Sequence, residues 1–129
     1  MRISAVTKCE VAVSPIPEKQ PVPEELTARL KAADIWQFVN AAFYGVFVRN
    51  GCMVVAQRNP DTGVYTGIGS SGYPLEGVGV AYLQWQGDQP FLYHKDCGAV
   101  PATPEQVETL RKFSADVKAA LGLEEAAGA

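Results

Sequence analysis

The sequence has no long hydrophobic run and no strong excess of charge. No apolar stretch in its 129 residues approaches the ~20 residues needed to span a bilayer, and the first residues lack the apolar core of a secretory signal. The formal net charge is −3, which gives no general attraction to double-stranded nucleic acid or to an anionic membrane. We therefore expect a soluble protein that contacts neither.

Cysteine and histidine are also scarce. The three cysteines, Cys9, Cys52 and Cys97, are odd in number and have no paired spacing, so we expect no disulfide framework and a cytoplasmic location. The only histidine, His94, stands three residues before Cys97, and a zinc site would need two further ligands. Strand positions three apart point to opposite faces, which disfavours a Cys–His catalytic pair. The sequence predicts no metal, no cofactor and no catalytic residue.

The apolar content is sufficient for one hydrophobic core. Apolar residues make up 47% of the chain and charged residues 19%, as in ordinary globular proteins. The length suits a single domain. We expect residues 1–123 to form one α+β domain and residues 124–129 to be a frayed tail.

The N-terminal third of the chain predicts a strand, a connector and a helix. Alternating apolar and polar residues indicate a strand within residues 3–13, and four prolines in residues 14–23 indicate an extended connector. Pro23 suits the first position of a helix, which we expect to continue to Gly45. Apolar residues recur every three or four positions along this helix: Ala28, Ala32, Ile35, Trp36, Val39 and Phe43.

The middle of the chain predicts two β-hairpins. The first spans residues 44–58 and turns at Asn50-Gly51, a pair that accepts positive φ at both positions. The second spans residues 78–94 and turns at Gly87-Asp88, with a short strand at residues 64–66 between the two.

The C-terminal segment predicts an amphipathic helix from Thr103 to about Leu121. Thr103 and Gln106 have the spacing of a capping box, Pro104 fits the first helical position, and Gly122 fits the stop. The whole order predicts an α+β fold, a single antiparallel sheet of about five strands with two packed amphipathic helices.

Residues 67–72 match the pattern G-x-G-x-x-G. The dinucleotide-binding version of this pattern needs a helix that starts inside it, and the following residues 73–77 will not sustain one. Anion binding is a less specific function that this segment still suggests, because a glycine-rich loop between strands exposes backbone N–H groups that attract an anion. Serine hydroxyls in the loop would add donors, although an unliganded mobile loop explains the same pattern.

Aromatic residues concentrate in the second half of the chain, where Tyr82 lies on one face of its predicted strand. Tyrosine is common where proteins stack on rings or bind partners, and arginines could supply charge to such a site. The candidate ligand-binding residues are therefore Gly67, Gly69, Ser70, Ser71, Tyr82, Arg58 and Arg111.

The sequence favours a non-enzymatic binding module over an enzyme. We expect a homo-oligomer that binds a small anionic or nucleotide-like ligand, since small sheets often complete their burial by pairing with a second copy. One alternative is a protein-binding accessory or inhibitor protein, including one of viral origin. The other alternative is a small enzyme that uses Cys97 or His94.

Overall fold

A computed structural model describes residues 20–123, which form an eight-stranded antiparallel sheet and two helices. The α+β class with one antiparallel sheet is confirmed, whereas the expected number of about five strands is wrong. The strand predicted at residues 3–13, most of the proline connector and the predicted tail lie outside the described residues. The elements are α1 (Pro23–Ala32), β1 (Trp36–Asn40), β2 (Tyr44–Arg49), β3 (Cys52–Arg58), β4 (Tyr65–Ile68), β5 (Gly72–Leu75), β6 (Gly79–Gln86), β7 (Gln89–His94), β8 (Gly98–Pro101) and α2 (Pro104–Leu121).

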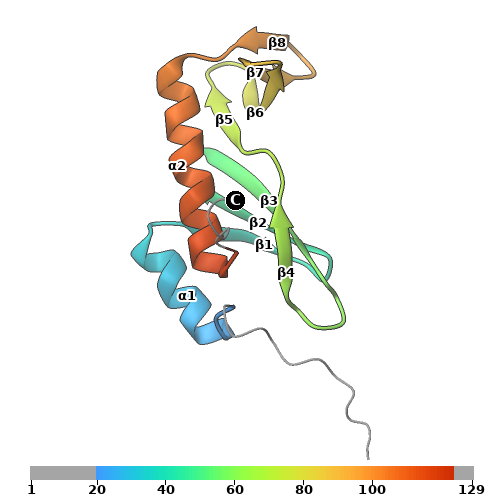
Figure 1. Ribbon diagram of the computed structural model, residues 1–129, viewed down its shortest axis with the longest axis vertical. Coiled ribbons are helices and arrows are strands. Elements are labelled where there is room, and N and C mark those ends of the chain that lie inside the picture. Colours follow the sequence, from blue (N-terminus) through green and yellow to red (C-terminus); the bar gives the residue numbers. More distant parts are fainter. Residues whose placement is uncertain (1–19, 124–129) are drawn as a thin grey trace, which may run out of the picture.

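The strands follow one another through the sheet in chain order. The order is β1-β2-β3-β5-β6-β7-β8, and β4 pairs with the end of β3 beside β5. Figure 1 shows the two ends of the sheet twisted relative to each other, with α2 running along both parts. Among the strands of residues 20–123, β1 and β8 are therefore terminal in the sheet.

The predicted first helix is too long. α1 ends at Ala32, and Asp34 has a φ of 62°, a left-handed conformation that breaks the helix before β1 begins. Residues 36–40 then alternate between exposed and half-buried positions, which is the period of a strand. Gly45 does not stop a helix but lies within β2, where a Cβ atom would stand 2.9 Å from the Tyr65 hydroxyl.

Both predicted hairpins are confirmed. Asn50 and Gly51 have φ values of 52° and 85° at the turn between β2 and β3. β6 and β7 pair from Tyr82 with Tyr93 to Gln86 with Gln89 around the second turn. The strands that sequence patterns did not indicate, β5 and β8, are four residues long, and each contains a proline.

The predicted C-terminal helix is also confirmed. The Thr103 side chain accepts a hydrogen bond from the Gln106 backbone N–H at 3.1 Å, and the Gln106 side chain accepts one from the Thr103 N–H at 2.9 Å. Gly122 caps the other end with a φ of 75°. α2 buries one stripe: Val107, Leu110, Phe113, Val117, Ala120 and Leu121.

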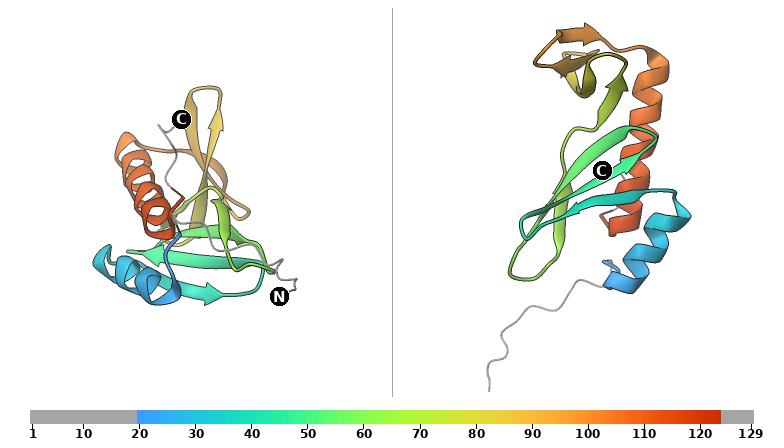
Figure 2. Two further views of the ribbon diagram at one scale, coloured as in Figure 1. Left: turned by 60° about the horizontal axis from the view of Figure 1, so that its bottom comes forward. Right: turned by 180° about the vertical axis from the view of Figure 1, so that it is seen from behind.

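Both helices pack on the same face of the sheet. The core between them is built on Phe47 and Val54, which are paired neighbours in β2 and β3, and on Leu92 in β7. Figure 2 shows α1 and α2 together on one side of the β1–β3 strands. At ~1.5–3 kcal/mol for each large apolar side chain removed from water, this layer is the main stabilising element of the fold. Within residues 20–123, no helix is both long and apolar enough to span a membrane.

Candidate functional site

The glycine–serine loop lies in a shallow hollow between the sheet and α2. The Gly69 N–H donates to the Val55 carbonyl at 2.9 Å, and the buried Ser71 hydroxyl lies 2.8 Å from the Ser114 hydroxyl of α2. The hollow has a volume of about 250 Å³ and is lined by Ile68, Gly69, Ser70, Ser71, Leu83, Trp85, Ser114 and Lys118. Gly67 is not part of its lining but pairs with Gln57 in the β3–β4 ladder.

Tyr82 and Arg111 lie elsewhere. Tyr82 points to the sheet face opposite Leu83, and its hydroxyl reaches the Met53 sulfur at 3.5 Å. Arg111 is two-thirds exposed on α2, 3.6 Å from Glu108. The structure therefore brings Gly69, Ser70 and Ser71 together but does not join Tyr82 or Arg111 to them.

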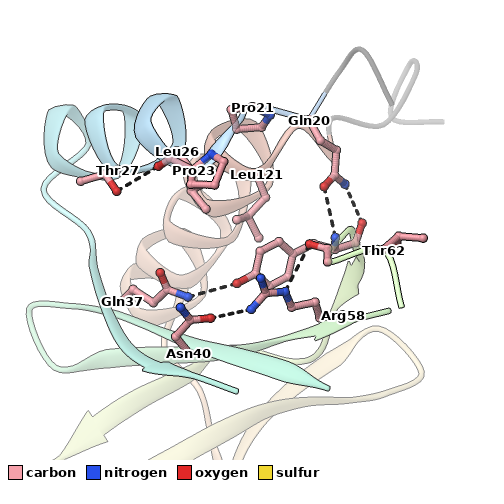
Figure 3. Close-up of a pocket in the computed structure, with 12 residues that line it drawn as sticks. Gln20, Pro21, Pro23, Leu26, Thr27, Gln37, Asn40, Arg58, Thr62 and Leu121 are labelled. Carbon is pink, nitrogen blue, oxygen red and sulfur yellow. Dashed lines mark hydrogen bonds between the residues drawn. The ribbon is translucent and has the colours of Figure 1, made fainter. Parts of the chain in front are cut away.

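Arg58 lies in a different and larger pocket of about 310 Å³. The pocket is enclosed by the start of α1, the ends of β1 and β3, the loop before β4 and the last turn of α2 (Figure 3). One wall is apolar, with Pro21, Pro23, Leu26 and Leu121. The other wall carries amide, hydroxyl and guanidinium groups from Gln20, Gln37, Asn40, Arg58, Thr62 and Tyr65.

Tyr65 is the centre of the polar wall. Its hydroxyl accepts a hydrogen bond from the Gln37 side chain at 3.0 Å. The Gln20 side-chain amide bonds both backbone groups of Tyr65, at 2.6 Å to the carbonyl and 3.1 Å to the N–H, as a neighbouring strand would. The ring is 5% exposed and meets the Phe47 ring edge-on at 5.8 Å between centroids. Tyr65 is therefore held rigidly at the floor of the pocket.

The Arg58 guanidinium lies over this ring, 5.3 Å from its centroid. Its Nε donates to the Gly63 carbonyl at 3.2 Å, and one Nη donates to the Asn40 side-chain oxygen and to the Ala41 carbonyl (Figure 3). The other Nη has no hydrogen-bond acceptor among residues 20–123. All the acceptors that hold Arg58 are neutral.

Among residues 20–123, Arg58 is the only charged residue in the pocket lining. Across residues 20–123, no carboxylate lies within ion-pair distance of Arg58. Arg49 provides the contrast: it also lies over an aromatic ring, that of Phe113, but it is paired with Asp116 at 2.9 Å. A buried or half-buried arginine normally has such a partner. In the part of the chain that the structure describes, Arg58 therefore lacks the acidic partner that Arg49 has.

The loop that follows β3 folds so as to complete this site. The Asn59 side chain accepts from the Asp61 N–H at 2.8 Å, and the Asn59 carbonyl accepts from the Gly63 N–H at 2.7 Å. This tight turn directs the Gly63 carbonyl towards Arg58. The turn was predicted from the sequence, and Arg58 was among the candidate ligand-binding residues. Gln37 and Asn40 were missed because they lay within the predicted first helix. The apolar–polar–apolar order of residues 36–38 is a weak strand signal, which Val39 interrupts.

His94 and Cys97 lie in one turn away from both pockets. The His94 Nδ1 accepts from the Asp96 N–H at 3.0 Å, and the exposed Cys97 thiol donates to the Gly98 carbonyl at 3.4 Å. Burial raises the pKa of the Cys52 thiol above its ordinary value, with a smaller opposing effect of the Arg49 charge. Within residues 20–123, no three histidine, cysteine or acidic side chains are grouped so that they could hold a metal ion.

No protein-family model matches the chain, and comparisons with curated proteins and with solved structures find none that is significantly similar.

Proposed function

We propose that the protein is a non-enzymatic binding module that holds a small anionic ligand in the Arg58 pocket. The observation that carries this proposal is the Arg58 guanidinium: among residues 20–123 it has no carboxylate partner, and no acidic residue of that range lines the pocket. A carboxylate or phosphate oxygen would supply the missing charge and accept from the unpaired Nη. The pocket lining also has no histidine, cysteine or carboxylate to act as a base or nucleophile, which favours binding over catalysis.

The shape of the pocket favours a compact ligand with one anionic group and an apolar body. Its volume of about 310 Å³ is at the lower end for ligand sites. The polar wall offers the Arg58 Nη, and the apolar wall suits a small ring or branched chain. A stacked nucleobase fits less well, because Arg58 covers one face of the Tyr65 ring and the Phe47 edge packs against that ring. The proposed ligand class is therefore a small carboxylate, with a nucleotide as the less favoured form.

Calorimetric titration with benzoate and with benzamide tests this proposal. The two probes share an apolar ring and differ in charge, so we expect saturable binding of benzoate, with Kd of order 0.1–1 mM for a ligand of this size, and at least tenfold weaker binding of benzamide. Arg58→Gln is expected to reduce benzoate affinity at least tenfold. Arg111→Gln is the matched control, because Arg111 is exposed on α2 and lines neither pocket.

Two outcomes would refute the carboxylate site. One is equal affinity for benzoate and benzamide, since the charge would then contribute nothing. The other is equal loss of affinity in Arg58→Gln and Arg111→Gln, which would indicate a general charge effect. A parallel titration with AMP tests the nucleotide form, which requires AMP to bind more tightly than benzoate.

The proposed module is cytoplasmic and homo-oligomeric. The exposed Cys97 thiol and the odd number of cysteines favour a reducing compartment. Within residues 20–123, the outer edges of β1 and β8 pair with no other strand, and such edges favour pairing between chains. Self-association of the full chain is tested together with its surface below.

A further inference from the structure

Four exposed aromatic residues gather on the hairpin formed by β1 and β2. Trp36 is 73% exposed, Phe38 70%, Phe43 68% and Tyr44 42%. Large aromatic side chains are usually buried, and a contiguous exposed group of them marks an interaction site. We call these four residues the aromatic surface.

Two of these residues, Trp36 and Tyr44, lie on the side of the sheet away from the helices. Trp36 pairs with Val48, and Tyr44 pairs with Gln57, so both alternate with the core residue Phe47. α1 and α2 cover only the face that carries Phe47 (Figure 2). Trp36 also borders a pocket beside α1 that Leu30 and Ile35 help to line, yet it remains 73% exposed.

Among residues 20–123, β1 is also a terminal strand, and its protection against pairing is limited to a bulge. Natural sheets discourage edge pairing with lysines, prolines or inward charges on the terminal strand. Residues 35–48 contain no charged residue and no proline. A bulge between Gln37 and Val39 shortens the regular part of β1, yet it leaves the Phe38 ring exposed. The aromatic surface therefore lies beside a sheet edge that carries no charged residue and no proline.

A second copy of the chain is the occupant that these features fit. Residues 35–48 carry no charge, so no like charges meet when this part of one copy contacts the same part of another. Each whole chain carries a net charge of −3. A full aromatic side chain offers ~150–250 Å², so the exposed fractions leave about 500 Å² of ring surface on each copy. Two copies would then bury ~1,000 Å² from these rings alone, the lower limit for a specific interface.

We propose that two copies associate about a two-fold axis on the β1 side of the sheet, with the aromatic surface of each copy packed against that of the other. This inference rests on the proposed homo-oligomer and names its surface. Two-fold symmetry places the same residues on both sides of the contact, so a single substitution changes it twice. This area is at the low end for a specific interface, so the dimer is sought over a wide range of protein concentration.

Sedimentation velocity of the full chain from 1 to 500 µM tests the inference. We expect the wild type to shift from monomer to dimer within this range. Phe38→Lys sets charges of one sign close together across the two-fold axis and is expected to weaken dimerisation at least tenfold. Trp36→Gln is a second variant that removes a ring without adding charge, with the same direction expected. Trp85→Lys is the matched control, since Trp85 is 52% exposed on β6, outside the aromatic surface.

The two experiments test the dimer surface and the Arg58 pocket separately. A wild type that stays monomeric at 500 µM overturns the dimer, and dimers unaffected by both Phe38→Lys and Trp36→Gln overturn the surface. Benzoate titration of the same samples reports on the Arg58 pocket independently, because Phe38 and Trp36 do not line it. Variants with unchanged benzoate affinity and weaker association support the proposal and show that both remain folded.

Discussion

At the scale of single residues, Gly69 and Gly72 of the glycine-rich segment differ in what a side chain would meet. A Cβ atom on Gly72 would stand 2.3 Å from a methyl group of Val80 and 3.0 Å from the Tyr82 ring. A Cβ atom on Gly69 would meet only the Val55 carbonyl, at 3.8 Å. Gly72 is therefore required by close packing between β5 and β6, whereas the Gly69 site tolerates a methyl group.

This difference predicts the effect of one alanine at each position. Gly72→Ala is expected to lower the free energy of unfolding by ~1–3 kcal/mol, because the rigid Val80 must move. Gly69→Ala is expected to change it by less than ~1 kcal/mol. Urea unfolding of the two variants checks the prediction, and equal destabilisation would contradict the packing explanation.

Also at the residue scale, Cys52 is expected to make the free energy of unfolding depend on pH. Because burial raises the pKa of its thiol in the folded state, the unfolded chain loses this proton at lower pH than the folded chain. The associated stability is complete below the ordinary pKa of 9.0 and is lost as the pH rises above it. Between pH 8 and pH 10 the wild type should therefore lose more unfolding free energy than Cys52→Ala, by no more than ~1.4 kcal/mol per pH unit. Cys97→Ala, at an exposed thiol, should retain the wild-type slope.

At the scale of elements, α2 depends on its capping box at Thr103. The hydroxyl and the Gln106 side chain satisfy two backbone N–H groups that the first turn leaves free. Thr103→Ala is expected to cost about 1 kcal/mol and to lower Tm by a few degrees. Thr103→Ser keeps the acceptor and should remain within about half of that loss. Thermal unfolding followed by circular dichroism measures both, and an unchanged Tm in Thr103→Ala would show that the cap is dispensable.

The elements that were predicted correctly are those whose sequence signals lie within a few neighbouring residues. Asn50-Gly51 and the Thr103 cap fix a hairpin and a helix start through contacts within a few residues. β1 was missed because its apolar residues also recur at three- and four-residue spacing, and only the exposure of Trp36 distinguishes the two patterns. Of the residues that line the Arg58 pocket, only Arg58 itself was among the site residues predicted from the sequence. Its remaining members come together through pairings between segments up to 45 residues apart, such as Gln20 with Tyr65, and no local pattern encodes these.

At the scale of the whole molecule, the single sheet separates two surfaces. The helix-covered face encloses the core and the Arg58 pocket, and the opposite face carries Trp36 and Tyr44 of the aromatic surface. The two share β1: Gln37 and Asn40 face the pocket, while Trp36 lies on the opposite side. Ligand binding and dimerisation can therefore be changed separately by substitutions on one strand.

The central claim is that the Arg58 charge is the anchor for an anionic ligand. Its most direct measurement is a benzoate titration of ¹⁵N-labelled protein in which the arginine Nε–H signals are followed by NMR and assigned with Arg58→Gln. We predict that the Arg58 signal shifts saturably, together with the side-chain amides of Gln37 and Asn40, while the Arg111 signal stays in place. A constant Arg58 signal, or equal shifts at Arg58 and Arg111, would contradict the proposed site.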